Sequence, residues 1–176
     1  PLGVVGLITP WNFPIAIPAW KAAPALAAGS AVVMKPAELT PGCAHLLAEV
    51  LEQAGCPPGV FNLVMGKGSE IGNALVEHPD VAAISFTGSE RVGRGIAQGC
   101  ARTMKKVQLE MGGKNPMVVL ADADLDLAVN ACLNGAFFST GQRCTASSRL
   151  IVEAEVHDAF VERLEKAMAA LVIGDP

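Results

Sequence analysis

Short apolar runs rich in β-branched residues alternate with alanine-rich or amphipathic stretches from residue 2 to residue 110. Apolar runs of this kind predict strands that are buried on both faces, and their alternation with helices predicts a parallel sheet. We therefore expect an α/β fold built on a doubly wound, Rossmann-like parallel sheet. The expected strands are residues 2–9, 31–35, 60–65, 81–86 and 105–110.

The segments between these strands have helical patterns. Residues 44–54, opened by Pro41, should form a helix, as should residues 70–77 and residues 89–100. Residues 14–28 are rich in alanine but contain two prolines, so here we expect helix only in pieces, broken at Pro18 and Pro24.

The pair Gly112–Gly113 marks a change in organisation, and we place a domain boundary there. Beyond it the pattern starts again with a second βα set, which predicts two domains, residues 1–112 and residues 113–176. The expected elements of the second domain are a strand at 117–120, a helix at 125–137 entered through Asp122 and Asp124, a strand at 149–152 and a helix at 156–171.

Polar residues follow several of the expected strands. Ligands of open parallel sheets bind in the crevice at the carboxyl ends of the strands. Thr9, Lys35, Thr87–Ser89 and Glu110 all fall at such ends, so the sequence predicts a binding site along this edge.

Three residues stand in surroundings that suit acyl chemistry through a thioester. Cys144 lies among small and polar residues beside Arg143, Glu110 precedes a glycine pair, and Asn12 stands between prolines. A thiol is nucleophilic as the thiolate, which nearby positive charge favours. Each residue also has an ordinary interpretation: a small buried hydrophobic side chain for a lone cysteine, a carboxylate that caps glycines, and a turn residue.

The motifs together resemble the aldehyde dehydrogenase superfamily, whose members oxidise aldehydes to acids with NAD(P). The resemblance runs along the whole chain, and five motifs occur in family order. They are Trp11–Pro14, Lys35–Glu38, Phe86–Ser89, Glu110–Lys114 and Gly141–Cys144. The resemblance identifies the first domain as part of an NAD(P)-binding domain and the second as the start of the catalytic domain.

The resemblance implies a catalytic role for three residues. Cys144 would add to the aldehyde to give a thiohemiacetal, which loses hydride to the nicotinamide and becomes a thioester. The side-chain amide of Asn12 and the backbone N–H of Cys144 would stabilise the oxyanion. Glu110 would activate the water that hydrolyses the thioester, and a carboxylate at the end of a buried strand suits that task. Lys21 would either tune charge near the site or lie on a solvated helix face.

The cofactor implied is NAD, with NADP possible, because Glu38 would accept hydrogen bonds from the adenosine ribose and repel a 2′-phosphate. The helix that starts at Ser89 would hold the pyrophosphate. A G-x-G-x-x-G motif is absent, and Gly66–Gly72 is one residue too long for it. An exposed Lys35–Glu38 ion pair and an ordinary Ser89 N-cap are the alternatives. The expected cofactor-binding residues are Thr9, Trp11, Lys35, Glu38, Gly68, Thr87, Gly88 and Ser89.

The surroundings of Cys144 and the segment Pro14–Lys21 most resemble the α-ketoglutaric semialdehyde dehydrogenases. The related succinate-semialdehyde enzymes commonly carry arginine where this chain has Trp20, so they are the second choice. Arg143 would hold a substrate carboxylate or face solvent. Two other classes stay open: a non-catalytic NAD-binding fragment, and a simple alcohol dehydrogenase that lacks a cysteine nucleophile.

Composition excludes other kinds of function. A net charge of −4 without a basic stripe argues against a nucleic-acid partner, and three scattered histidines argue against a metal site. Five cysteines without a C-x-x-C pair, and no apolar stretch of about 18 residues, predict a cytoplasmic protein without membrane spans.

Both ends of the chain fall close to expected elements, so we interpret it as the middle of a longer enzyme. The parent is expected to be a homodimer or homotetramer. Because 51% of the residues are hydrophobic, we expect the 176 residues alone to self-associate and to lack activity.

Overall fold

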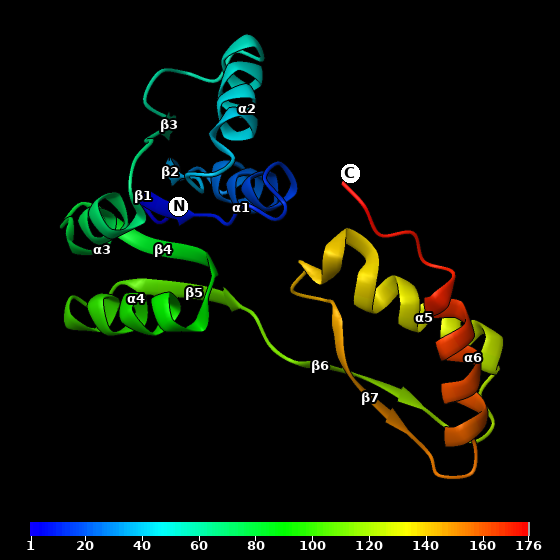
Figure 1. Cartoon of the computed structure of the whole chain (residues 1–176). Helices are drawn as coiled ribbons and strands as arrows, with labels where there is room; N and C mark the ends of the chain where they lie inside the picture. Colours follow the sequence, from blue (N-terminus) through cyan, green and yellow to red (C-terminus); the bar gives the residue numbers. More distant parts are fainter. Residues whose placement is uncertain (176) are drawn as a thin grey trace. The chain divides into compact units, whose positions relative to one another are not determined.

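The computed structural model describes residues 1–175 (Figure 1). The chain forms two compact units, Pro1–Gly112 and Gly113–Pro176, called here the N-terminal and the C-terminal unit. Each unit has its own sheet and its own hydrophobic core, and each is described by itself.

The N-terminal unit is built on a five-stranded sheet in which every neighbouring pair is parallel, in the order β3-β2-β1-β4-β5. This order confirms the predicted doubly wound α/β fold. The strands are β1 (Val4–Ile8), β2 (Ala31–Lys35), β3 (Phe61–Leu63), β4 (Val81–Gly88) and β5 (Lys106–Met111).

Helices cover both faces of this sheet (Figure 1). On one face, Leu7 and Met34 pack with residues of α1 (Ala16–Ala27) and α2 (Pro41–Gln53). On the other, Ile84 and Phe86 pack with residues of α3 (Asn73–Glu77) and α4 (Glu90–Arg102). Alternate residues of β4 therefore point to different helices, so Ala83 and Ser85 face the α1 side.

Helix α1 corrects one expectation: it is a single helix and is not broken at its prolines. Pro18 lies in the first turn, where the missing N–H has no partner inside the helix. Pro24 lies in the interior and removes the bond to the carbonyl of Trp20, a residue on the solvent side with 69% of its surface exposed. The helix therefore loses one hydrogen bond on its outer side and continues.

Two further elements differ from the prediction. The strand expected at 60–65 is limited to the three residues of β3. The segment expected as a helix from Glu70 begins earlier, with a π-helical turn η1 (Gly68–Gly72) that runs directly into α3. The earlier start matters because it brings the backbone N–H of Gly68 to the site described below.

The C-terminal unit is a parallel pair of strands packed with two helices. Its elements are β6 (Asn115–Val119), α5 (Leu125–Phe137), a short 3₁₀ turn η2 (Phe138–Gly141), β7 (Ser147–Val152) and α6 (His157–Ala169). Phe160, Val119 and Cys132 are its most buried core residues. Asp124 caps α5 by accepting hydrogen bonds from the N–H groups of Asp126 and Leu127. Among residues 1–175, no helix combines the length and the apolar content needed to span a bilayer.

Candidate active site

The strand order reverses between β1 and β4, and the carboxyl ends of these strands mark the crevice where doubly wound sheets bind ligands. Thr9 directly follows β1, and Thr87 and Gly88 end β4. Thr9 is buried, and its N–H donates to the carbonyl of Lys35 at 3.1 Å. Its Oγ1 is also buried and has no hydrogen-bond partner within residues 1–175. A buried hydroxyl without a partner is costly, so this position suits a polar ligand group.

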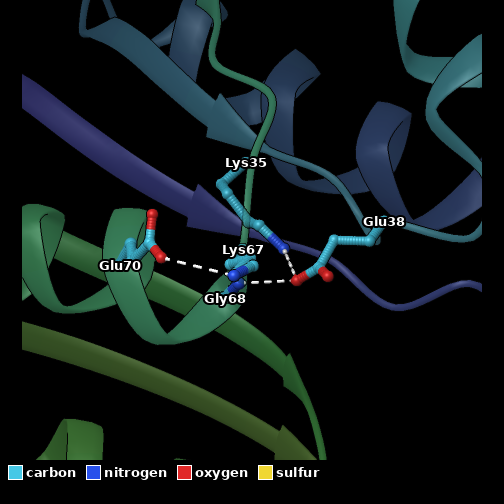
Figure 2. A network of polar contacts seen from close by, with 5 residues as sticks. All are labelled: Lys35, Glu38, Lys67, Gly68 and Glu70. Carbon is cyan, nitrogen blue, oxygen red and sulfur yellow. Dashed lines mark hydrogen bonds and ion pairs between the residues drawn. The ribbon is translucent and has the colours of Figure 1, made fainter.

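A compact polar cluster lies beyond the end of β2 (Figure 2). Glu38 Oε1 accepts a hydrogen bond from the backbone N–H of Gly68 at 2.6 Å and lies 3.4 Å from Lys35 Nζ. Lys67 and Glu70 form an exposed ion pair beside them. The expected ion pair between Lys35 and Glu38 is present, but only Glu38 is exposed, since Lys35 is buried with 4% exposure. The backbone bond from Gly68 is the main cause that lowers the pKa of Glu38, and burial partly opposes it.

A pocket of about 290 Å³ adjoins the same carboxylate. Its wall comes from the loop after β2 and from the turn that precedes η1. The lining residues are Pro36, Ala37, Glu38, Pro41, Met65, Gly66 and Lys67. A largely apolar wall with one ionised carboxylate at its rim fits a flat heterocycle joined to a hydroxyl-bearing sugar.

Helix α4 begins directly after β4. The Ser89 side chain accepts from the N–H of Val92 at 3.4 Å, so the N-cap interpretation describes what this side chain does. The first turn of any helix still has backbone N–H groups without partners inside the helix, and these can bind a phosphate. Glu90, in that turn, pairs with Arg94 at 2.7 Å.

Lys21 is not on a solvated helix face. It is partly buried, and its Nζ donates to Ser85 Oγ at 2.7 Å. Ser85 in turn donates to Gln108 Oε1 at 2.6 Å. Burial lowers the pKa of Lys21, and the negative charge of Glu110 acts in the opposite direction. Glu110 therefore lies within electrostatic reach of the Lys21 ammonium.

Ser85 and Gln108 were not among the expected site residues. A signal for them exists in the strand alternation, because Gln108 and Glu110 are two residues apart on β5 and must share a face. The register pairs Ser85 with Gln108 and Thr87 with Glu110. Nothing in the sequence indicates that Lys21, 64 residues before Ser85, reaches this face.

Glu110 was expected at the end of a buried strand, and this expectation is wrong for the N-terminal unit. Strand β5 is the outer strand of the sheet, most of its residues are exposed, and Glu110 is exposed with them. Asn12 and Trp11 follow β1 in the same unit; Asn12 is half-buried, and 42% of the surface of Trp11 is exposed.

Cys144 lies in the C-terminal unit, in the loop between η2 and β7. It is the exposed one of the five free cysteines, whereas Cys100 and Cys132 are buried. Burial raises the pKa of both of these thiols, which makes them poor nucleophiles. The Asn115 side-chain amide, also not predicted, donates to the carbonyl of Cys144 at 2.5 Å.

The three expected catalytic residues are thus divided between the units, with Asn12 and Glu110 in the N-terminal unit and Cys144 in the C-terminal unit. The N-terminal unit brings Glu110 together with Lys21, and it brings Glu38 together with Gly68 and Lys35. Within residues 1–175 no cluster of three His, Cys, Asp or Glu side chains could hold a metal ion.

Comparison with known proteins gives a match along the whole chain. The profile of the Aldehyde dehydrogenase family matches residues 1–176. The chain is 53% identical to an alpha-ketoglutaric semialdehyde dehydrogenase of Bacillus subtilis, with 99% of this chain and 36% of that protein covered.

Two solved structures extend the comparison. A crystal structure of an E. coli NADP dependent enzyme matches with a TM-score of 0.96 and 50% identity, covering 99% of this chain and 36% of that one. A betaine aldehyde dehydrogenase from Staphylococcus aureus, in complex with NAD+, matches with a TM-score of 0.96 and 42% identity, covering 99% and 35%. The chain thus spans about a third of the length of the proteins it matches.

Proposed function

Since this chain belongs to the aldehyde dehydrogenase family, we propose that it carries the nucleophile and the general base of an enzyme that oxidises an aldehyde to a carboxylic acid. The observation that carries the proposal is Cys144: an exposed thiol in a loop whose backbone is held by neighbouring side chains. The other cysteines are buried or half-buried. An alcohol dehydrogenase of the simple hydride-transfer kind needs no such residue.

Cys144 is proposed to attack as the thiolate, forming a bond between its Sγ and the carbonyl carbon. The carbonyl oxygen then becomes an oxyanion, which the Asn12 amide and the Cys144 N–H would stabilise by hydrogen bonds. When bound, NAD supplies the hydride acceptor. After oxidation the substrate is held on Cys144 as a thioester.

Glu110 is proposed as the base that takes a proton from the water attacking this thioester. Its exposure leaves the carboxylate accessible to such a water. Lys21, within electrostatic reach of this carboxylate, is proposed to tune the charge near the site. Ser85 would keep the ammonium in place by accepting its hydrogen bond.

The described residues fit NAD as the cofactor. Glu38 offers an ionised carboxylate, aimed by Gly68, beside a pocket of heterocycle size. A carboxylate in this place favours a ribose with a free 2′-hydroxyl over a 2′-phosphate, and so favours NAD over NADP. Thr9, Trp11, Thr87, Gly88 and Ser89 complete the proposed cofactor site.

For the substrate we propose an acidic semialdehyde, with α-ketoglutaric semialdehyde first and succinic semialdehyde second. The similarity to the Bacillus subtilis enzyme supports this choice. A structural neighbour is named for a different aldehyde, betaine aldehyde, which is why the test below includes it. The enzyme is proposed to work in the cytoplasm as a homodimer or homotetramer, and its five free cysteines are consistent with a reducing compartment.

The test uses the protein expressed from its complete reading frame. Cys144→Ala should abolish NAD-dependent oxidation while NAD affinity, measured by fluorescence quenching, stays within about twofold. Retained oxidation would exclude the covalent mechanism. A panel of α-ketoglutaric semialdehyde, succinic semialdehyde, betaine aldehyde and propanal then ranks substrates by kcat/KM, and an equal or better value for propanal would exclude the acidic-semialdehyde assignment.

A further inference from the structure

The backbone just before Cys144 adopts an unusual conformation. Ser139, Thr140 and Gly141 follow one another with φ values of 53°, 54° and 68°. For a residue with a side chain, the left-handed region costs about 1–2 kcal/mol. A Cβ at Gly141 would lie 2.8 Å from the carbonyl oxygen of Ala136, so this position requires glycine. Such a turn persists only where its surroundings fix it.

Arg143 provides one such contact. Its Nη2 donates to the carbonyls of Asn134 and, at 3.5 Å, Gly135, whereas its Nε is buried without a hydrogen-bond partner within residues 1–175. The guanidinium carbon also lies 5.0 Å from the centre of the Phe138 ring, a cation–π distance. Both carbonyls belong to the last turn of α5, where carbonyl groups lack partners inside the helix and carry partial negative charge. Arg143 therefore caps the C-terminal end of α5.

Asn115 holds the other side of the same loop. Its Nδ2 donates to the carbonyl of Cys144 at 2.5 Å and to that of Ala146 at 3.2 Å. Asn115 begins β6 and pairs with Ser147 of β7, so the sheet fixes its position. The backbone of Cys144 is thus held to α5 on one side, through Arg143, and to β6 on the other.

We propose that Arg143 is a positioning residue, which sets the orientation of the Cys144 thiol and N–H by fixing their loop to the end of α5, and that it does not bind a substrate carboxylate. This inference rests on the proposed function in one respect, the role of Cys144 as nucleophile. The Nη2 of the guanidinium is already engaged with two helix carbonyls, and the guanidinium carbon lies over an aromatic ring. Misplacement of a reacting group by about 1 Å can reduce a rate about a hundredfold, so such a contact affects catalysis without touching substrate.

The test compares Arg143→Met and Arg143→Lys in the protein expressed from its complete reading frame. The first readout is the rate at which iodoacetamide alkylates Cys144, followed by mass spectrometry of the Cys144 peptide. The second is kcat/KM for succinic semialdehyde and for propanal. A positioning role predicts that alkylation slows about tenfold or more in Arg143→Met, and that kcat/KM falls by the same factor for both aldehydes. Arg143→Lys should recover part of both, because it keeps the charge near the helix end.

A carboxylate-binding role predicts a different pattern: KM rises for succinic semialdehyde alone, while propanal oxidation and Cys144 alkylation are unchanged. That result would overturn the inference. Arg163→Met is the matched control, because Arg163 forms an exposed ion pair with Asp126 between α6 and α5 and should leave both readouts unchanged.

If Arg143→Met does not fold, Arg143→Lys and Asn115→Ala carry the same comparison. Loss of the Asn115 amide should also slow the alkylation of Cys144. An alkylation rate that is unchanged in both Arg143→Lys and Asn115→Ala would overturn the inference. The alkylation rate needs no turnover. It therefore separates a failure of this inference from a failure of the proposed function, which would appear as activity retained in Cys144→Ala.

Discussion

The backbone N–H of Gly68 donates to Glu38 Oε1 at 2.6 Å, although 30 residues separate the two in the chain. The π-helical turn η1 starts at Gly68 and directs this N–H toward the loop after β2. The bond lowers the pKa of Glu38, with Lys35 contributing less. A carboxylate that is ionised and aimed before the cofactor binds loses little conformational freedom on binding.

Gly68→Pro tests this contact. Lys67, at φ −64° and ψ 136°, already has the extended conformation that a residue before proline prefers, and the first helical position accepts proline. The change therefore removes the N–H donor with little other disturbance. Glu38 should lose its main stabilising bond, so its pKa should rise, and NAD affinity should fall about five- to tenfold, measured by titration calorimetry.

The control for this prediction is Gly68→Ala, which keeps the donor. Its Cβ would meet Lys35 Nζ at 3.6 Å and Glu38 Oε1 at 3.7 Å, both ordinary contacts.

The lowered pKa of Glu38 also fixes the direction in which stability and NAD binding change with pH. Because the folded-state pKa of Glu38 is lowered, the stabilisation is present above the unfolded value and is lost as pH falls through the folded value. The acid limb of NAD binding should therefore move to higher pH in Gly68→Pro but not in Gly68→Ala.

Glu38→Ser should shift cofactor preference toward NADP. The change removes the carboxylate that is proposed to accept the ribose hydroxyls and to repel a 2′-phosphate. We expect the ratio of kcat/KM for NADP to that for NAD to rise at least tenfold. An unchanged ratio of the two kcat/KM values would mean that Glu38 does not contact the ribose, even though its bond to Gly68 is present.

The sequence predicts much of this fold because buried strands and capped helices are local patterns. Asp124 and Ser89 mark the starts of α5 and α4, and apolar runs mark β1, β2 and β4. The contacts that shape the site are not local. Gly68 with Glu38, and Lys21 with Ser85, join segments far apart in the chain, and a single sequence contains no signal for such pairs.

The roles of Cys144, Glu110 and Asn12 came from resemblance to a family, and the structure divides the three between two units. For Arg143, neither expected role describes the contacts observed. Its carbonyl partners depend on the left-handed turn at Ser139–Gly141, and two of these three residues are types that seldom adopt that conformation.

Glu110→Gln should separate the two halves of the reaction. The thiol can still attack and the substrate can still be oxidised, but hydrolysis of the thioester lacks its base. Stopped-flow absorbance should show a burst of NADH, close to one equivalent per active site, followed by turnover slowed at least a hundredfold. Normal steady-state rates without a burst would assign the base to another residue.

Lys21 offers a way to test the placement of Glu110 without measuring activity. The carboxylate of Glu110 raises the pKa of Lys21, while burial lowers it by more, so the net pKa lies below the ordinary lysine value. Glu110→Gln removes the raising effect and should lower the pKa of Lys21 further. Ser85→Ala removes the acceptor 2.7 Å from Nζ and should act in the same direction, because a hydrogen bond to an ammonium favours the charged form.

The pKa of Lys21 can be followed by ¹³C NMR after reductive methylation, with Lys21→Arg used to assign its signal. Lys166, which pairs with Glu162 on the exposed side of α6, supplies an internal reference signal in both variants. The linkage has a definite sign. Because the folded-state pKa of Lys21 is lowered, the unfolded chain binds more protons between the folded and unfolded values, and stability rises with pH across that window. Glu110→Gln should extend this pH window to lower values, because the folded-state pKa of Lys21 falls further.

An unchanged Lys21 titration in Glu110→Gln would mean that the carboxylate points away from Lys21, Ser85 and Gln108. The proposed effect of Lys21 on the charge near the site would then be wrong.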